Sequence, residues 1–309
     1  MILQYLREIQ RKKHVANEEY SKLNKIRVFQ EKTISQLDKE LQDSIRSNEQ
    51  YRNLHKGKRC FVLGSGPSLK TLDFSVLKNE YVFTVNQLPR DADFYKLHSN
   101  YHFWSDRLFF ELSNEREEDR ELLDVMKSVK NADNSPTVFY EATAYRMIKD
   151  NHLDKELDIH YFVHGDYPYR NQYLNENLVE LTTVLPRFST VIHYLICVAV
   201  YMGFSEIYLL GCDCTGFLVA ANNRMNMADK APYSYDISPN EKKRAERISR
   251  ERSIRDELAS QVAIFDEYGF LHSYCERNGV KLYNATDGGL LDSIPRRSLK
   301  EIFGLEEQG

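Results

Sequence analysis

Residues 59–68 read RCFVL-GSGPS, a largely apolar pentapeptide followed by a glycine-rich break. The break consists of Gly64, Ser65, Gly66, Pro67 and Ser68. A short apolar run bounded by such a break is typical of a buried strand. Glycines permit a tight turn and a close approach to a ligand, and proline followed by serine suits the start of a helix. We therefore predict the first strand-to-helix turn of a nucleotide-binding α/β domain, with N–H groups facing phosphate. A turn that only packs strand against helix is the alternative.

The rest of the chain alternates between β-rich runs and helical patterns. Predicted strands cover 59–63, 81–86, 101–105, 136–140, 159–163, 206–211 and 280–284, and the clearest helices cover 190–203 and 253–278. This alternation is typical of a mostly parallel sheet with helices on both faces. We predict a Rossmann-like α/β domain over 58–290, followed by a C-terminal tail over 291–309.

Residues 1–57 differ in composition from this domain. They contain no proline and no glycine before Gly57, and Ile34, Leu37, Leu41 and Ile45 recur at spacings of three and four. Such spacing predicts an amphipathic helical arm. The arm either pairs as a coiled coil, making a homo-oligomer, or folds back on the main domain.

Composition narrows the function classes. The 309 residues carry a net charge of −4, which gives no basic face for nucleic acid. Five cysteines without regular pairing indicate a reducing compartment, and Cys212 and Cys214 lack the second cluster that a zinc site needs, so no metal is expected. No apolar stretch approaches the length of a membrane span, and the N-terminus does not resemble a signal peptide. We expect a cytoplasmic protein; peripheral contact with the inner face of the plasma membrane stays open.

Polar residues and glycines lie at or just after the ends of several predicted strands, at the edge where open parallel sheets bind ligands. This set comprises Asn86, Gln87, Ser105, Asp106, Gly211, Asp213, Asn284, Asp287 and Gly288. Ser189 and Thr190 precede a helical pattern, so they are expected to cap it and to face the same edge. One such residue is ordinary turn chemistry, but the group predicts a site.

Residues 215–255 form a long polar insertion in which Tyr233 and Tyr235 precede a basic run. A loop of this length is typical of a lid, and closure would exclude water while the tyrosine hydroxyls donate to a departing phosphate. A solvated basic helix and contact with anionic lipid are the alternatives.

Several of these segments resemble bacterial sialyltransferases that use CMP-sialic acid. The similar segments are 64–70 followed by 73–75 and Leu77, then 84–87, 198–213 and 281–283. The ending 284–289 is more similar to a related group, which includes the motility-accessory-factor flagellin glycosyltransferases and archaeal 6-hydroxymethylpterin diphosphokinase-like proteins. The resemblance covers about 58–290 and does not extend to the arm.

The resemblance implies an inverting, metal-independent glycosyltransferase that needs no cofactor. Its donor would be a CMP-activated acidic sugar such as a nonulosonic acid, and its acceptor a saccharide or protein in surface-glycan assembly. Gly64, Ser65, Gly66 and Ser68 would hold the nucleotide with help from Asn86. Ser189 or Thr190 would contact the nucleotide or the donor sugar, and Tyr233 and Tyr235 would support the leaving phosphate.

Two departures from the sialyltransferase pattern concern the site. Ser65 stands where those enzymes carry asparagine, and the stretch 256–262, where their histidine base is expected, contains no histidine. A base is required because the attacking hydroxyl must lose its proton. The candidates are Asp256, Glu257, Asp213, Asp106 and His164.

Two other functions are compatible with the same residues. A pterin diphosphokinase would bind ATP and magnesium at the same edge, with Asp213 and Asp287 near the metal. A catalytically degenerate transferase domain would instead be a scaffold for a polysaccharide-assembly complex.

Overall fold

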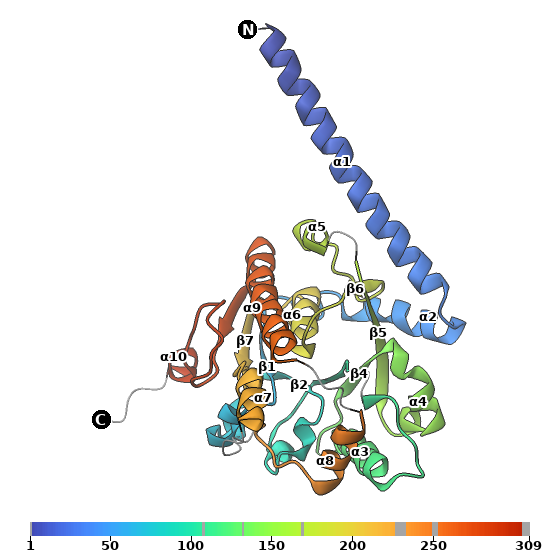
Figure 1. The fold of residues 1–309 in the computed structure, drawn as a ribbon, viewed down its shortest axis with the longest axis vertical. Helices are drawn as coiled ribbons and strands as arrows, with labels where there is room; N and C mark the ends of the chain where they lie inside the picture. The colour runs from blue at the N-terminus through green and yellow to red at the C-terminus, as the bar shows by residue number, and fades with distance from the viewer. Residues whose placement is uncertain are drawn as a thin grey trace.

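The computed structural model describes residues 2–106, 109–131, 133–167, 170–225, 233–248 and 253–304. Parts of the predicted insertion and of the C-terminal tail lie outside these ranges. The described residues form an α/β fold, as predicted (Figure 1). It is built on one eight-stranded sheet in the order β6-β5-β4-β3-β2-β1-β7-β8, whereas the sequence predicted seven strands and no order. Each pair of neighbouring strands is parallel. The strands are β1 (Arg59–Leu63), β2 (Tyr81–Val85), β3 (Tyr101–Trp104), β4 (Thr137–Glu141), β5 (Asp158–Gly165), β6 (Val184–Pro186), β7 (Glu206–Leu210) and β8 (Lys281–Asn284).

Helices cover both faces of this sheet. The α-helices are α1 (Ile2–Ser35), α2 (Lys39–Ser47), α3 (Glu117–Lys127), α4 (Tyr145–Asp150), α5 (Arg170–Asn175), α6 (Val191–Tyr201), α7 (Gly216–Arg224), α8 (Pro239–Ile248), α9 (Ile254–Arg277) and α10 (Leu299–Phe303). Short 3-10 helices are η1 (Asn48–Tyr51), η2 (Pro67–Thr71), η3 (Phe74–Leu77), η4 (Leu88–Arg90), η5 (Phe94–Lys96), η7 (Ala142–Ala144) and η8 (Leu153–Lys155). Among the described helices, none has the length and hydrophobicity needed to cross a lipid bilayer.

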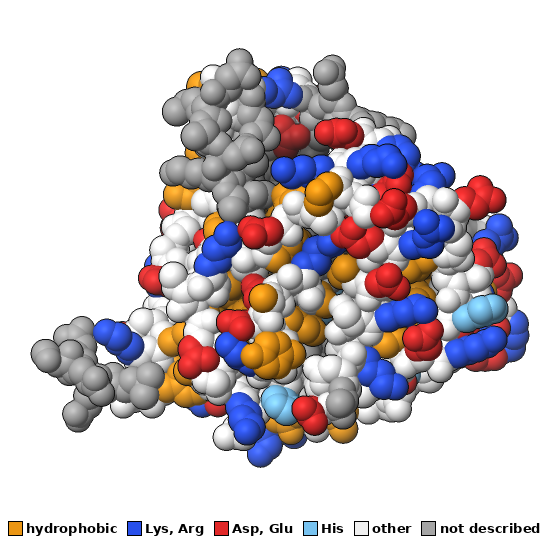
Figure 2. All heavy atoms as spheres, turned by 90° about the horizontal axis from the view of Figure 1, so that it is seen from below, with side chains coloured by type: hydrophobic (Ala, Val, Ile, Leu, Met, Phe, Trp, Pro, Cys, Tyr) orange, Lys and Arg blue, Asp and Glu red, His pale blue; other side chains and the backbone are white. Residues whose placement is uncertain are grey.

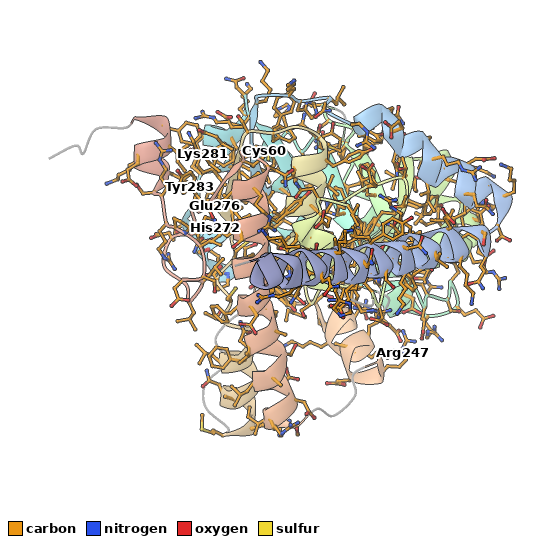
Figure 3. The ribbon with its side chains drawn as sticks, turned by 90° about the horizontal axis from the view of Figure 1, so that it is seen from above. Cys60, Arg247, His272, Glu276, Lys281 and Tyr283 are labelled. Atoms are coloured by element: carbon orange, nitrogen blue, oxygen red, sulfur yellow. The ribbon has the colours of Figure 1, made fainter. Side chains whose placement is uncertain are left out.

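Side chains of β1 show how the sheet separates two cores. Cys60 and Val62 pack with α6 and α9 on one face, whereas Phe61 and Leu63 pack with η2 and η3 on the other. This alternation is the period-two pattern of a strand buried on both faces. Figure 3 shows α9 passing next to β8, with His272 and Glu276 along the helix.

The prediction of an α-helix directly after the glycine turn is wrong. The described segment 64–80 contains η2 and η3 and no α-helix. The Asp73 side chain caps η3 by accepting a hydrogen bond from the Ser75 N–H at 3.0 Å. A second 3-10 helix therefore begins shortly after η2, and the first one does not continue as an α-helix. A five-residue 3-10 helix has no long row of aligned peptide dipoles, so the predicted helix-end field is absent here.

The N-terminal arm divides into two parts. Leu41 and Ile45 of α2 are buried against the body of the domain next to β5, and Gln30 of α1 donates to Thr183 Oγ1 at 2.9 Å. The rest of α1 extends away from the body, and Tyr20 is exposed there (Figure 1). The spacing from Ile34 to Ile45 thus produces packing against the chain's own domain.

The described end of the chain also packs on the body. Residues 284 and 296 form a parallel bridge, and the ring of Phe303 in α10 stacks on Phe61 with centroids 5.6 Å apart. Helix α10 therefore packs on the face of the sheet that carries Phe61 and Leu63, whereas Leu291 and Ile294 belong to the core on the opposite face.

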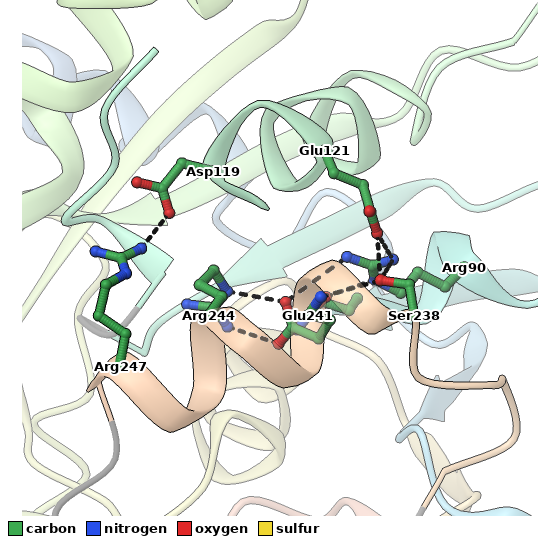
Figure 4. A network of polar contacts seen from close by, with 8 residues as sticks. Arg90, Asp119, Glu121, Ser238, Glu241, Arg244 and Arg247 are labelled. Carbon is green, nitrogen blue, oxygen red and sulfur yellow. Dashed lines mark hydrogen bonds and ion pairs between the residues drawn. The ribbon is translucent and has the colours of Figure 1, made fainter. Parts of the chain in front are cut away.

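Charged side chains attach the insertion helix α8 to the domain (Figure 4). Glu241 accepts hydrogen bonds from Arg244 at 2.7 and 2.8 Å, and both residues are buried. Ser238 and Arg90 both contact Glu121 of α3, and Arg247 pairs with Asp119 of the same helix. Most basic residues of α8 thus form ion pairs with carboxylates.

On the face drawn in Figure 2, cationic and anionic side chains are interspersed around a region of hydrophobic and uncharged residues.

We expect Glu241→Ala to destabilise the protein strongly. The change takes the carboxylate away from the buried guanidinium of Arg244, and loss of one partner of a buried pair typically costs about 3–5 kcal/mol. Urea-induced unfolding measures this loss. Lys242→Ala, which changes an exposed residue of the same helix, should shift the free energy of unfolding by less than about 0.5 kcal/mol. Equal effects of the two variants would show that the pair does not hold α8.

Candidate functional site

The order of strands places a crevice at the centre of the sheet. From β1 the chain proceeds through β2 to β6 on one side, and it then returns to β7 and β8 on the other. In open parallel sheets, ligands bind where the connections leave in opposite directions like this. The glycine turn after β1 and the Gly211–Cys212–Asp213 turn after β7 meet there, with Gly64 N donating to Leu210 O at 2.8 Å and Gly66 N to Gly211 O at 2.9 Å.

The two glycines of the first turn are explained by this contact. A Cβ on Gly64 would lie 2.4 Å from Gly211 O, and one on Gly66 would lie 1.9 Å from Asp213 Oδ2. The φ of Gly66 is −69°, which any residue adopts, so close packing and not turn geometry requires glycine. In the structure, the absence of side chains at these glycines lets the two turns approach each other, and their role in binding a ligand stays a prediction.

Asp213 occupies the position predicted for phosphate. Its Oδ1 accepts from the Ser68 N–H at 3.2 Å, and its Oδ2 accepts from Ser68 Oγ at 2.8 Å. Burial raises the pKa of the Asp213 carboxyl, while the hydrogen bonds from Ser68 act in the opposite direction. Since the Ser68 N–H already holds a carboxylate, the predicted contact between this N–H and a phosphate is not available in this structure.

A cavity of about 260 Å³ opens beside the two turns. Its walls come from the β1 and β7 turns, the end of β2, the start of α6, one face of α9 and the insertion. The lining residues include Gly64, Ser65, Gly66, Pro67, Asn86, Thr190, Gly211, Asp213, Tyr233, Gln261, Ile264 and Tyr268. We call it the glycine cavity.

The insertion reaches the glycine cavity through Tyr233. Ser234 N donates to Ser65 O at 2.9 Å, which fixes this segment to the glycine turn. The rings of Tyr233 and Tyr235 stack with centroids 5.1 Å apart, and Tyr235 is buried behind Tyr233. Tyr233 itself is 38% exposed. Desolvation raises the pKa of both phenols, so the Tyr233 hydroxyl keeps its proton at neutral pH and can donate a hydrogen bond.

A second cavity, of about 420 Å³, adjoins the first. It is lined by Asn86, Ser105, Asp106, His164, Arg187, Phe188, Ser189, Thr190, Val191 and Tyr194. We call it the polar cavity; it shares Asn86, Thr190 and Val191 with the glycine cavity. The ring of His164, at the end of β5, stacks on Tyr194 with centroids 5.3 Å apart. The structure thus brings Ser105, Asp106, His164, Ser189 and Thr190 together.

Asn86 lies at the junction of the two cavities in a left-handed backbone conformation, with φ 45°. Its N–H donates to Phe103 O at 2.9 Å, and its carbonyl lies 3.0 Å from His102 Nε2. Burial lowers the pKa of His102 to about 3, so this ring is neutral; Nε2–H donates to Asn86, and Nδ1 accepts from the Thr84 hydroxyl at 2.8 Å. The side-chain Oδ1 of Asn86 is buried and has no hydrogen-bond partner among the described residues.

Other predicted site residues lie outside these two cavities. Gln87 is buried beneath α8, where Nε2 donates to Glu241 at 2.8 Å and Oε1 accepts from Arg90 at 2.6 Å. Asn284, Asp287 and Gly288 line a third cavity of about 430 Å³, together with Arg296 and Lys300. The Asn284 side chain itself is buried and donates to Leu291 O at 2.8 Å.

The two carboxylates predicted near the missing histidine lie in the first turn of α9. Asp256 is exposed and accepts a hydrogen bond from Ser253, the N-cap of the helix. Within the described structure, neither Asp256 nor Glu257 is part of the lining of the glycine or polar cavity. No group of three or more His, Cys, Asp or Glu side chains that could hold a metal ion occurs among the described residues.

Among the lining residues that were not predicted from the sequence, Arg187 and Gln261 carry long polar side chains. Arg187 follows β6, a strand of three residues that is too short to give an alternating pattern. Gln261 lies mid-helix in α9, and its Nε2 is buried without a hydrogen-bond partner among the described residues. Gln261 shares one face of α9 with Ile264 and Tyr268, and a polar residue among these largely apolar side chains is the sequence signal that could have identified it.

The chain is similar to solved structures of two bacterial enzymes. No protein-family model and no curated protein matches the sequence. The sialyltransferase CstII from Campylobacter jejuni, solved in complex with the substrate analogue cytidine-5'-monophosphate, aligns with a TM-score of 0.42 and 21% identity over 78% of this chain and 85% of that chain. The monofunctional α-2,3-sialyltransferase Cst-I from Campylobacter jejuni aligns with a TM-score of 0.44 and 16% identity over 78% of this chain and 80% of that chain. At these identities the likeness concerns the fold.

Proposed function

We propose that the chain is a glycosyltransferase that takes an acidic sugar from a CMP-activated donor and passes it to a hydroxyl of a saccharide or protein. The nucleotide occupies the glycine cavity, the sugar and acceptor meet in the polar cavity, and the phosphate lies at their junction. The observation that carries the proposal is the buried, unpartnered Oδ1 of Asn86 at this junction. A buried acceptor without a partner is costly, so a ligand group that donates to it is favoured. In CMP the donors are the ribose hydroxyls and the cytosine amino group, while the phosphate oxygens only accept. The motif resemblance at 64–70 and 84–87 supports a CMP moiety as that ligand.

The start of α6 supports the placement of phosphate. Thr190 is the N-cap of this eleven-residue helix, and Thr190 and Val191 line both cavities. The positive end of a helix dipole stabilises an anion, and Tyr233 lines the glycine cavity as an additional hydroxyl donor. Arg187 lines the polar cavity and pairs through Nε with Asp166 at 2.8 Å, so a sugar carboxylate there would share or replace this partner. Together these groups would stabilise the charge on departing CMP.

His164 is our proposed general base. Of the five candidates, His164 and Asp106 line the polar cavity. The Asp213 carboxylate accepts hydrogen bonds from Ser68, and Asp256 and Glu257 lie in the first turn of α9, outside both cavities. In a direct displacement with inversion, the acceptor hydroxyl attacks the anomeric carbon, its proton passes to His164, and CMP leaves with the electrons of the broken bond. The proposed reaction uses no cofactor.

Binding of CMP to Asn86→Gly tests the proposal. Glycine adopts φ 45° freely, so this change removes the carboxamide and leaves the backbone intact. Loss of one hydrogen bond worth about 0.5–1.5 kcal/mol should weaken CMP binding about two- to tenfold, measured by calorimetry. Asn86→Ala should weaken CMP equally and should also lower stability by about 1–2 kcal/mol, because alanine is strained in this conformation.

The same titration separates the alternatives. Binding of ATP with magnesium, in preference to CMP, would support a pterin diphosphokinase-like activity. Failure of the wild-type protein to bind any nucleotide, together with no hydrolysis of a CMP-sugar, would support a scaffold.

A further inference from the structure

We propose that Glu267 is a positioning residue for the transfer, acting through the loop 188–190; this inference rests on the proposed function. Glu267 belongs to α9 and is 3% exposed. Its Oε2 accepts two hydrogen bonds, from the Ser189 backbone N–H at 2.8 Å and from His193 Nδ1 at 2.9 Å. One buried carboxylate oxygen therefore joins the loop to the first turn of α6.

The loop is held in place from two sides. Phe188 N donates to the Tyr194 hydroxyl at 2.9 Å, and Ser189 N donates to Glu267. The ring of Tyr268, next to Glu267 in sequence, meets the edge of His193 with centroids 4.3 Å apart. Since Ser189 and Thr190 line the polar cavity and Thr190 also lines the glycine cavity, these contacts fix the wall between the two.

Glu267 also connects this wall to the other side of the glycine cavity. Gln261, Ile264 and Tyr268 line that cavity from the same helix. A displacement of α9 would therefore be passed to Ser189 through Glu267. Small misplacements of groups around a reacting centre have large effects on rate, up to about 10²-fold for 1 Å.

The sign of the charge distinguishes positioning from electrostatic binding. A carboxylate near the start of α6 opposes the attraction of the helix end for a phosphate. If Glu267 acted mainly through its charge, removing the charge would tighten CMP binding. If it acts by holding the loop, removing it should loosen Ser189 and slow transfer.

The experiment compares Glu267→Ala with Glu267→Gln, which keeps an oxygen acceptor. We expect Glu267→Ala to lower kcat about tenfold or more, with a smaller change in KM, and to increase hydrogen exchange in residues 187–192. Glu267→Gln should recover most of the rate, and it serves as the folded variant if the alanine variant fails to fold. The control is Asn48→Ala: Asn48 is buried and donates to Tyr161 O and Leu181 O, outside both cavities.

Each contrary outcome overturns the inference. Tighter CMP binding by Glu267→Gln would show an electrostatic role. Unchanged exchange at 187–192, or an equal loss of kcat in Asn48→Ala, would show that Glu267 contributes only to stability. If wild-type protein bound no CMP, the proposed function itself would fail, and the exchange measurement would still show whether Glu267 holds the loop.

Discussion

We expect His164→Asn to transfer sugar about 10² to 10⁴ times more slowly than the wild type, the usual contribution of a general base. Asparagine retains a polar side chain of similar reach but cannot take the proton of the attacking hydroxyl. His164 lines the polar cavity and not the glycine cavity, so the affinity for CMP should change little. Initial rates of CMP release with donor and acceptor present, together with calorimetric binding of CMP, measure the two quantities separately.

A second histidine provides the matched control. His152 is exposed and has φ 56°, a conformation that asparagine tolerates, so His152→Asn makes the same chemical change away from the site. It should leave the rate unchanged. A loss below tenfold for His164→Asn, with a much larger loss for Asp106→Asn, would transfer the role of base to Asp106. Large losses for Asp256→Asn or Glu257→Gln would instead show that α9 moves toward the acceptor during the reaction.

The sequence was sufficient for seven of the eight strands because these are short apolar runs with strong local signals. β1 and β7 are examples: each is buried over four of its five residues and is followed directly by glycine. The β6 strand was missed because three residues, one of them proline, give no alternation. The helix expected after Pro67 was wrong because Asp73 provides a competing cap only six residues later.

The site was predicted only in part because sequence reveals strand ends but not strand order. Asn86 and Asp213 follow strands on the two sides of β1, so both reach the central crevice. Asn284 is the last residue of β8, at the outer edge of the sheet, and the turn after it faces a different cavity. Gln87 shows a second limit, because its partner Glu241 is 154 residues away and no local pattern links them.

We expect Gly66→Ala to lower both the stability of the protein and its affinity for CMP. A Cβ at this position would lie 1.9 Å from Asp213 Oδ2 and 2.6 Å from Gly211 O, so both the Asp213 side chain and the backbone of the β7 turn must move. Overpacking of this kind costs about 1–3 kcal/mol, and the φ of −69° adds no conformational strain. Urea unfolding should show this loss, and CMP binding should weaken because the displaced turn forms a wall of the glycine cavity.

A double variant separates the two contacts behind this prediction. Asp213→Ala removes the carboxylate that the new methyl group meets, so adding it to Gly66→Ala should recover part of the stability lost, although the contact with Gly211 O persists. Gly269→Ala is the control: a Cβ there meets nothing within 4 Å in α9, and alanine in a helix is favoured over glycine by about 0.5–1 kcal/mol. Strict additivity of Gly66→Ala and Asp213→Ala would mean that the Asp213 side chain moves aside at no cost. In that case its hydrogen bonds to Ser68 would not be what holds the two turns together, and the crevice at the centre of the sheet would be more adaptable than its close backbone contacts indicate.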